Sequence, residues 1–261
     1  MGKMPFKDND IEAMIKGIES GLYDNYNLPV KYYNALVEYI SKAVFDGFGA
    51  DFTTVSMLDT ALLNELTNNI YMFGAAKTFQ QTKEISSLLV DENRNIRSSS
   101  EFNKIARDTY NNWNNTWGVT EYNTAIAQAD AAAKWADIER QQDVMPYLEY
   151  STIGDACVIC KPLDGIIAPV NDAIWNKVAP TNHFGCMCIL LQRNSDVKTT
   201  ENNKTIVNGV VEKMKEKKQD IFINNVGKTG EIFTKDHPYF EVPQQYKNFA
   251  MNNFNLPIPK R

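Results

Sequence analysis

The chain has 261 residues, of which 43% are hydrophobic and 23% are charged. This composition supports a buried core in one or two domains and excludes an intrinsically disordered chain. The formal net charge of −5 argues against a surface built mainly to wrap nucleic acid. The charge is uneven, with +4 on residues 193–261 and −9 on residues 1–192, so any contact with phosphate is expected in the later segment.

The sequence shows no targeting or membrane segment. The first ten residues lack the apolar stretch of a signal peptide, and the longest apolar run, residues 186–191, has six residues. A membrane-spanning helix needs about 20 apolar residues. We therefore expect a protein that is neither secreted by the usual route nor bound to a membrane, in a compartment where thiols stay reduced.

The first 142 residues are expected to be helical, because apolar residues recur at helical spacing. Gly47 and Gly49 are interpreted as the stop of the second helix and not as a phosphate-binding loop. Ser99 or Ser100 is expected to cap the fourth helix, and Thr120 the fifth. The expected helices span about residues 9–22, 27–46, 56–89, 100–113 and 120–142.

The fifth expected helix has a face of small residues. Ala125, Ala129 and Ala133 lie four residues apart and would let a second helix approach closely. No pair of titratable groups accompanies them, so we expect this face to dock a partner protein. The tryptophans of the region are expected to pack in the core, with base stacking as the alternative: Trp113, Trp117 and Trp135.

A change of pattern after Pro146 indicates a small β-rich module over residues 143–195. Residues 147–153 alternate in polarity and are β-prone. Asp164 and Gly165 provide a turn between two short apolar runs, which predicts a β-hairpin. This module holds all four cysteines and one of the two histidines of the chain. Its chemistry is therefore expected to reside in these side chains.

The spacing of these donors is typical of a structural zinc site. Cys157 and Cys160 form a Cys-x2-Cys pair, and His183, Cys186 and Cys188 form a second cluster. Zn²⁺ takes four tetrahedral ligands of thiolate and imidazole type. Cys186 and Cys188 alternate along an expected strand, so both sulfurs can face one metal. Five donors compete for four places, so His183 either binds the metal or supports a ligand, and we predict one zinc ion per chain.

Other interpretations of the cysteines remain open. Two disulfides would form if the protein were oxidised after release into an extracellular particle. A redox-active Cys-x-x-Cys pair normally lies at a helix N-terminus, whereas Pro162 and Asp164 follow this pair. A Cys/His nucleophile needs an orienting third group, which the sequence does not reveal. The thiols could also be free and simply buried.

The module contains a distinctive series of short motifs: TIGDACVIC, then LDG, then Pro169, Asp172 and Trp175, and then Pro180, His183, Cys186 and Cys188. This series resembles the phage head morphogenesis proteins of the Mu F-like minor head family. Met187 departs from the family, in which Arg is more usual between the last two cysteines. The alanine-rich helix ahead of the module is also similar, so the resemblance covers about residues 30–192.

This resemblance implies a structural minor head protein of a tailed phage or prophage. The expected partners are the portal protein, other capsid proteins and the packaged DNA, with a role in head assembly and in DNA ejection. The expected location is the portal vertex of the virion, and the host cytoplasm during assembly. We expect no small-molecule substrate and no membrane contact.

Residues 196–261 are expected to form a linker and a small mixed α/β tail, with strands over residues 221–225 and 231–242. Four lysines on a short basic helix are candidates for weak DNA binding: Lys213, Lys215, Lys217 and Lys218. The sequence Gly227-Lys228-Thr229 lacks the first glycine of a phosphate-binding loop, so no nucleotide site is expected there.

Taken in order, the chain predicts an α+β fold: a helical arm over residues 1–142, the Cys/His module over 143–195 and the tail over 196–261. No catalytic constellation is visible, so the chain is expected not to be an enzyme. Two other functions compete with the structural role. The tail could be a small effector enzyme joined to the Mu F-like module, or the chain could be an internal DNA-binding head protein.

Overall fold

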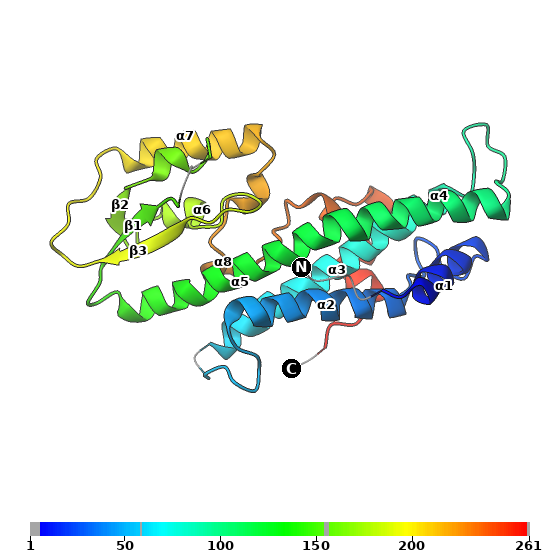
Figure 1. Ribbon diagram of the computed structural model, residues 1–261, viewed down its shortest axis with the longest axis horizontal. Helices are drawn as coiled ribbons and strands as arrows, with labels where there is room; N and C mark the ends of the chain where they lie inside the picture. Colours follow the sequence, from blue (N-terminus) through cyan, green and yellow to red (C-terminus); the bar gives the residue numbers. More distant parts are fainter. Residues whose placement is uncertain (1–5, 58, 154–156, 260–261) are drawn as a thin grey trace. The chain divides into compact units, whose positions relative to one another are not determined.

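The computed structural model describes residues 6–57, 59–153 and 157–259 and has the expected α+β fold (Figure 1). Its longer helices are α1 (Asp8–Glu19), α2 (Val30–Phe48), α3 (Thr60–Ser87), α4 (Ser99–Asn111), α5 (Gly118–Gln141) and α7 (Asn203–Glu216). The short helices are α6 (Trp175–Val178), α8 (Val226–Thr229) and α9 (Lys247–Met251). The strands are β1 (Tyr147–Ser151), β2 (Ile167–Pro169) and β3 (Ile189–Arg193).

Contacts divide the chain into two units, each built from segments that are distant in sequence. Unit 1 comprises residues 1–43, 67–123 and 238–261, and unit 2 comprises residues 44–66 and 124–237. The expected domain boundaries near residues 142 and 195 stay predictions. No helix in the described ranges is both long enough and apolar enough to cross a bilayer.

The sequence predicts the end of the second helix at Gly47 and Gly49, and α2 ends at Phe48, directly before Gly49. Gly47 lies inside α2, and a Cβ atom placed on it would lie 2.2 Å from the carbonyl oxygen of Ile126 in α5. The glycine therefore permits a close helix crossing within unit 2. Gly49, with φ at +76°, follows the last residue of α2 and takes the left-handed conformation common after a helix.

The fourth and fifth expected helices are one continuous helix, so the prediction of a cap at Thr120 was wrong. A π-helical segment, η1 (Asn112–Trp117), joins α4 directly to α5. Thr120 lies inside this helix and donates its hydroxyl to the carbonyl of Thr116 at 3.3 Å. The cap of α4 is Ser98, one residue earlier than expected, whose hydroxyl accepts the backbone N–H of Glu101.

Two of the three tryptophans pack as predicted. Trp113 and Trp135 are buried, whereas Trp117 is 45% exposed and does not belong to the core. The indole N–H of Trp113 donates to Glu84 at 2.8 Å. A buried indole with its N–H satisfied is typical of core packing and not of a base-stacking surface.

Unit 1 encloses a buried ion pair that the sequence did not reveal. Lys77 of α3 donates to Glu121 of α5 at 2.5 Å, and the two side chains are 0% and 6% exposed. Lys77 also donates to the backbone carbonyl of Trp113 in η1 at 3.1 Å. Burial lowers the pKa of Lys77, and the charge of Glu121 opposes that shift. The pair thereby ties α3 to the π-helical segment of unit 1.

Unit 2 contains a three-stranded antiparallel sheet in the order β2-β1-β3 (Figure 1). The expected turn is present, because the N–H of Ile166 donates to the carbonyl of Leu163 and Gly165 adopts φ of +74°. The apolar run before this turn is not a strand, however, so the expected hairpin was wrong. β2 pairs instead with β1, with Leu148 opposite Ala168.

The segment after α7 contains no strand within residues 219–243, all of which the structure describes. The two expected strands were therefore wrong. Asn225 explains part of the difference, because its side chain accepts the N–H of Gly227 and starts the single turn α8. Lys228 of that turn lies 4.9 Å from the ring centre of Trp135, where it makes a cation–π contact.

Candidate metal centre

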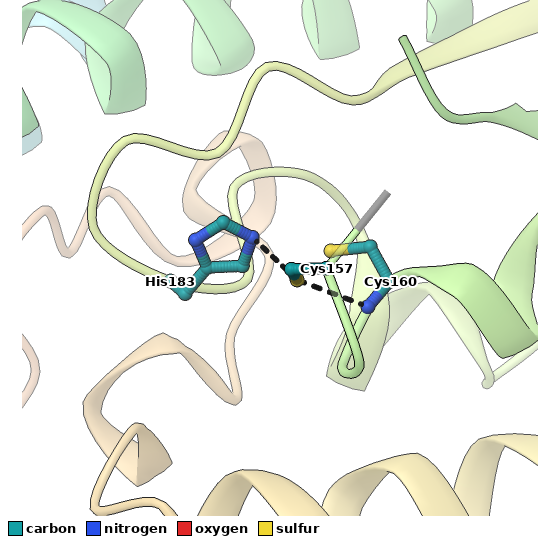
Figure 2. Close-up of side chains that lie close together, drawn as sticks. All are labelled: Cys157, Cys160 and His183. Carbon is teal, nitrogen blue, oxygen red and sulfur yellow. Dashed lines mark hydrogen bonds between the residues drawn. The ribbon is translucent and has the colours of Figure 1, made fainter. Parts of the chain in front are cut away.

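Cys157 and Cys160 lie on a tight turn that follows β1 (Figure 2). The backbone N–H of Lys161 donates to the carbonyl of Cys157 at 2.9 Å, which closes the turn. The N–H of Cys160 points to the sulfur of Cys157 at 3.4 Å. A backbone N–H directed at a sulfur stabilises the thiolate form, which is the form that binds metal.

The second cluster lies between α6 and β3. A turn over residues 183–186 is closed by the N–H of Cys186, which donates to the carbonyl of His183 at 3.1 Å. Gly185 has φ of +71°, a conformation that a glycine adopts without strain. Cys186 and Cys188 precede β3 instead of lying in it, but their alternation still directs both sulfurs to one side.

His183 is oriented for coordination through Nε2. Its Nδ1 lies 2.9 Å from the carbonyl oxygen of Phe184, which can only accept a hydrogen bond. Nδ1 therefore carries the proton, and the lone pair of Nε2 remains available in the neutral ring. Nε2 lies 3.1 Å from the sulfur of Cys157, as Figure 2 shows.

The five donor atoms form one continuous cluster. Those of Cys157, Cys160 and His183 lie within 4.8 Å of one another, as do the sulfurs of Cys160, Cys186 and Cys188. Cys160 is common to both groups. The Cys160 and Cys186 sulfurs are 3.8 Å apart. A zinc ion with Zn–S bonds of about 2.3 Å needs tetrahedral sulfurs about 3.8 Å apart, so this spacing fits zinc.

The electrostatics of the cluster favour a thiolate at Cys186 and an imidazolium at His183 before metal binds. Hydrogen bonds from Cys160 and Cys188 lower the pKa of Cys186 far below its ordinary value, and His183 adds to this shift. The same sulfur contacts raise the pKa of Cys160 and of Cys188. Interaction with Cys186 raises the pKa of His183 to about 9, although partial burial opposes the shift. A divalent cation would replace these shared protons.

Buried side chains hold the second cluster in place. Asn182 is fully buried and donates to the hydroxyl of Tyr150 at 2.9 Å and to the carbonyl of Val178 at 3.2 Å. Tyr150 belongs to β1, so these bonds tie the residue before His183 to the sheet. Sequence reasoning missed both residues, because a single Asn and a strand Tyr give no signal of this role.

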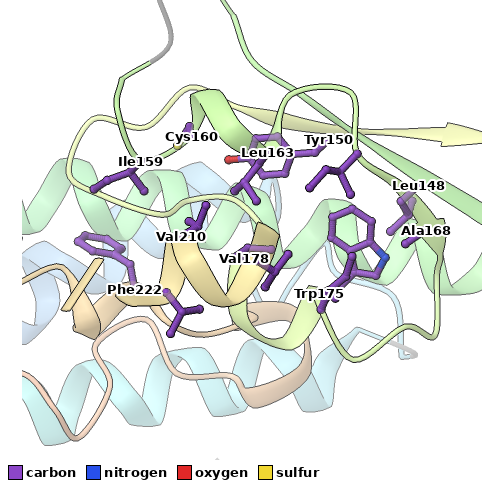
Figure 3. Packing of buried hydrophobic residues seen from close by; sticks show 14 of the residues in the cluster. Leu148, Tyr150, Ile159, Cys160, Leu163, Ala168, Trp175, Val178, Val210 and Phe222 are labelled. Atoms are coloured by element: carbon purple, nitrogen blue, oxygen red, sulfur yellow. The ribbon is translucent and has the colours of Figure 1, made fainter. Parts of the chain in front are cut away.

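The cysteines also form part of the hydrophobic core of unit 2 (Figure 3). Cys160 and Cys186 are 1% and 7% exposed. Their neighbours in this cluster of buried residues come from the sheet, the helices and the loops: Leu148, Tyr150, Ile159, Leu163, Ala168, Trp175, Val178, Val210 and Phe222. The metal-binding atoms therefore lie at the border of the core and not on an exposed loop.

All four cysteines are free thiols in this structure. The Cys-x-x-Cys turn leads into a three-residue 3-10 segment, η2 (Lys161–Leu163), and not into a long helix. The helix N-terminus that activates redox cysteines is therefore missing from the described residues that follow Cys160. The spacing of the donor atoms is compatible with metal coordination.

The predicted DNA-binding lysines lie at the end of α7. Lys213 donates to the carbonyl of Val158 at 3.4 Å. Lys215 pairs with Glu212 at 2.9 Å, and both side chains are largely exposed. Lys217 and Lys218 are exposed beyond the helix. Two of the four ammonium groups thus already have acceptors within the protein.

The small-residue face of α5 is not an exposed docking surface. Ala125 and Ala129 are 0% exposed and Ala133 is half-buried. The neighbouring residue Ile126 makes a close contact with Gly47 of α2 within the chain. Docking of a partner on the three alanines would require rearrangement, and their role in partner binding stays a prediction.

One family model matches part of the chain. Residues 93–191 match the family model described as phage Mu protein F like protein. The matched segment covers less than half of the chain and includes α4, α5 and all five donors of the candidate metal centre. No curated protein and no solved structure matches the chain.

Proposed function

We propose that this chain, a Mu F-like phage head morphogenesis protein over residues 93–191, is a structural minor head protein that acts at the portal vertex during head assembly. Its expected neighbours are the portal protein, other capsid proteins and the packaged DNA. The single observation that carries the proposal is the family match over the segment that contains the cysteine cluster.

We further propose that the cluster holds one structural zinc ion. Cys157, Cys160, Cys186 and either His183 or Cys188 would supply the four ligands. When bound, the ion would cross-link the turn after β1 to the segment before β3, which are 26 residues apart in the pairs Cys157–His183 and Cys160–Cys186. A site built from protein donors alone is closed to substrate, which is typical of structural and not catalytic zinc.

A structural role also fits the later residues better than a separate effector enzyme does. Residues 238–257 pack against unit 1 through aromatic contacts, such as Trp113 with Tyr239 and Phe79 with Phe254. They are part of the fold of the helical unit. A self-contained catalytic domain would instead need its own core, which a segment shared with unit 1 does not provide.

The proposal is tested by co-expression with the portal and major capsid proteins of the same phage or prophage. Purified heads should contain the chain, and the portal should co-purify with it from cells that lack the major capsid protein. A Cys160→Ser/Cys186→Ser variant should be lost from heads, whereas Lys104→Ala, on the exposed side of α4, should be retained. Heads of normal composition and infectivity without the chain would refute the assembly role.

A further inference from the structure

Residues 238–257 form an irregular strap on unit 1. The strap contains α9 and three 3-10 turns of three residues, and no strand within the described residues. The backbone-to-backbone hydrogen bonds that the structure records for it run between residues of the strap itself, such as Glu241 N–H to the carbonyl of Pro238 and Tyr246 N–H to the carbonyl of Pro243. The strap can therefore leave the helices without breaking their backbone hydrogen bonds.

Aromatic side chains anchor the strap at separate points along its length. Tyr239 stacks on Trp113 at 5.1 Å between ring centres. Tyr246 packs edge-on against Phe79 at 5.0 Å, and Phe254 stacks on the same ring at 4.8 Å. A few large anchors with little regular structure between them are characteristic of a bound linear peptide.

Polar contacts fix the position of the strap at both of its ends. Near the start, the Tyr239 hydroxyl donates to Glu121 at 2.9 Å, and Gln80 donates to the carbonyls of Tyr239 and Glu241 at 3.0 and 2.7 Å. Near the end, Tyr33 donates to the carbonyl of Pro257 at 2.6 Å. Side chains of the helices thus recognise carbonyl groups of the strap, as they would those of a separate peptide.

The end of the strap is conformationally strained. Asn253, Phe254 and Asn255 all have φ between 50° and 55°. A bulky residue such as Phe rarely adopts this left-handed conformation, which costs free energy relative to an ordinary backbone. The stacking of Phe254 on Phe79 compensates for the strain while the strap is bound. Release of the strap would relieve it.

We propose that the strap-binding surface, formed by Tyr33, Phe73, Phe79, Gln80, Trp113 and Glu121, takes the strap of a second copy of this chain in exchange for its own. The occupant is the strap of a second copy, because every copy carries the same strap and the same strap-binding surface. Exchange would link copies through contacts that the single chain already makes. The inference is independent of the proposed function.

The test uses the full chain and a fluorescent peptide of residues 238–259, with binding followed by fluorescence anisotropy. The chain's own strap is tethered, so its effective concentration is high and the wild-type chain should bind the peptide weakly. Tyr246→Ala weakens the tethered strap by removing its contacts with Phe79 and Asn25. This variant should bind the wild-type peptide about tenfold more tightly, because one buried aromatic anchor no longer competes.

Met251→Ala is the matched control, because Met251 lies in the strap but is 76% exposed. It should bind the peptide as the wild type does. If Tyr246→Ala does not fold, Phe249→Ala replaces it, since Phe249 contacts Tyr26 and Phe254 but is only half-buried. A folded strap variant that gains no affinity for the peptide overturns the proposal.

Sedimentation of the unmodified chain tests exchange between copies. The wild type should form a concentration-dependent dimer or larger assembly, and an excess of the peptide should dissociate it. Peptide carrying Tyr246→Ala should dissociate the assembly less effectively. A chain that remains monomeric at its highest soluble concentration, although a strap variant binds the peptide, overturns the assignment of the second copy as the occupant.

Discussion

The cores of unit 1 and unit 2 are built from different interactions. Unit 1 packs long helices around aromatic rings and a buried Lys77–Glu121 pair. Unit 2 has strands of three to five residues and places Cys160 and Cys186 at the edge of its core. Helix packing supplies stability along the whole helix, whereas a small sheet needs additional restraint. Loss of a metal should therefore damage unit 2 and leave unit 1 folded.

The largest expected effect is that of disrupting the proposed metal site of unit 2. Cys160→Ser removes the sulfur that both donor groups share. Structural zinc contributes an apparent binding free energy on the order of 10–16 kcal/mol in small domains, so the region around β1 and β3 should unfold. Hydrogen exchange followed by mass spectrometry should show lost protection over residues 147–193 and retained protection in α1 and α4.

Elemental analysis provides the control for this result. Protein purified under reducing conditions should contain one zinc per chain, and Cys160→Ser should contain none. The exposed Met187, which lies between two donors and has no ligand role, gives the matched variant Met187→Ala, which should keep its zinc. Wild-type protein that is metal-free yet fully protected in unit 2 would show that the cluster is not a metal site.

The second expected effect concerns the ion pair of unit 1. Lys77→Met leaves the Glu121 carboxylate buried without its cation, which typically costs about 3–5 kcal/mol in the free energy of unfolding. The double variant Lys77→Met/Glu121→Gln removes both charges and should recover much of that loss. Denaturant titration followed by circular dichroism measures both values.

The pair between Lys134 and Asp130 on α5 is the matched control. Its side chains are 60% and 47% exposed, and the two charges lie 2.7 Å apart. Lys134→Met should change the free energy of unfolding by no more than about 0.5 kcal/mol, because an exposed pair contributes little. Equal effects of Lys77→Met and Lys134→Met would mean that the buried pair does not restrain unit 1.

The sequence predicted helices and the donor cluster better than it predicted connections. Apolar spacing located α1 to α5 to within a few residues, because each helix buries one face. It missed the continuity of α4 and α5, since a π-helical segment such as η1 has no spacing of its own. Gly47 was interpreted as a stop because a glycine in a helix usually lowers stability. The crossing with Ile126 that requires it is a tertiary contact.

The difference between local spacing and tertiary contacts also explains which site residues the sequence predicts. Spacing brought Cys157, Cys160, His183 and the last two cysteines into one group, because zinc ligands are few, lie close together and are mainly thiolates and imidazoles. Lys77 and Glu121 are 44 residues apart, and nothing in local sequence relates them. The two strands expected after α7 are absent from residues 219–243 for a local reason. Asn225 caps α8, and this cap competes with strand formation.

The proposed zinc binding by unit 2 should depend on pH. The pKa of His183 in the metal-free protein is raised to about 9. Below that pH the imidazole is protonated, and a zinc ion that binds Nε2 must displace the proton. Zinc affinity should therefore rise with pH between about 7 and 9, by about tenfold per unit for this proton. Competition with a zinc chelator at several pH values measures the slope.

His183→Asn distinguishes a ligand from a supporting residue. If His183 binds zinc, the slope of log zinc affinity against pH should be smaller by about one in this variant, because one proton fewer is displaced. Lys77→Met, in the other unit, should leave the slope unchanged. A slope that His183→Asn does not alter would assign the fourth ligand to Cys188 and leave His183 as a hydrogen-bond partner of the cysteines.

The smallest expected effect is DNA binding by the four lysines at and just after the end of α7. Two of these lysines already interact within the protein: Lys215 pairs with Glu212, and Lys213 donates to the carbonyl of Val158. Binding should be weak and should depend on salt with a slope of about −2.7 in log units, which corresponds to about three neutralised phosphates.

Lys217→Ala/Lys218→Ala should reduce the magnitude of the slope by about 1.8, because each phosphate contact contributes about 0.9. Lys104→Ala, an exposed lysine of α4, should not change it. Tight binding that persists at high salt would require stacking or base contacts, for which the exposed Trp117 is available and the buried Trp113 and Trp135 are not.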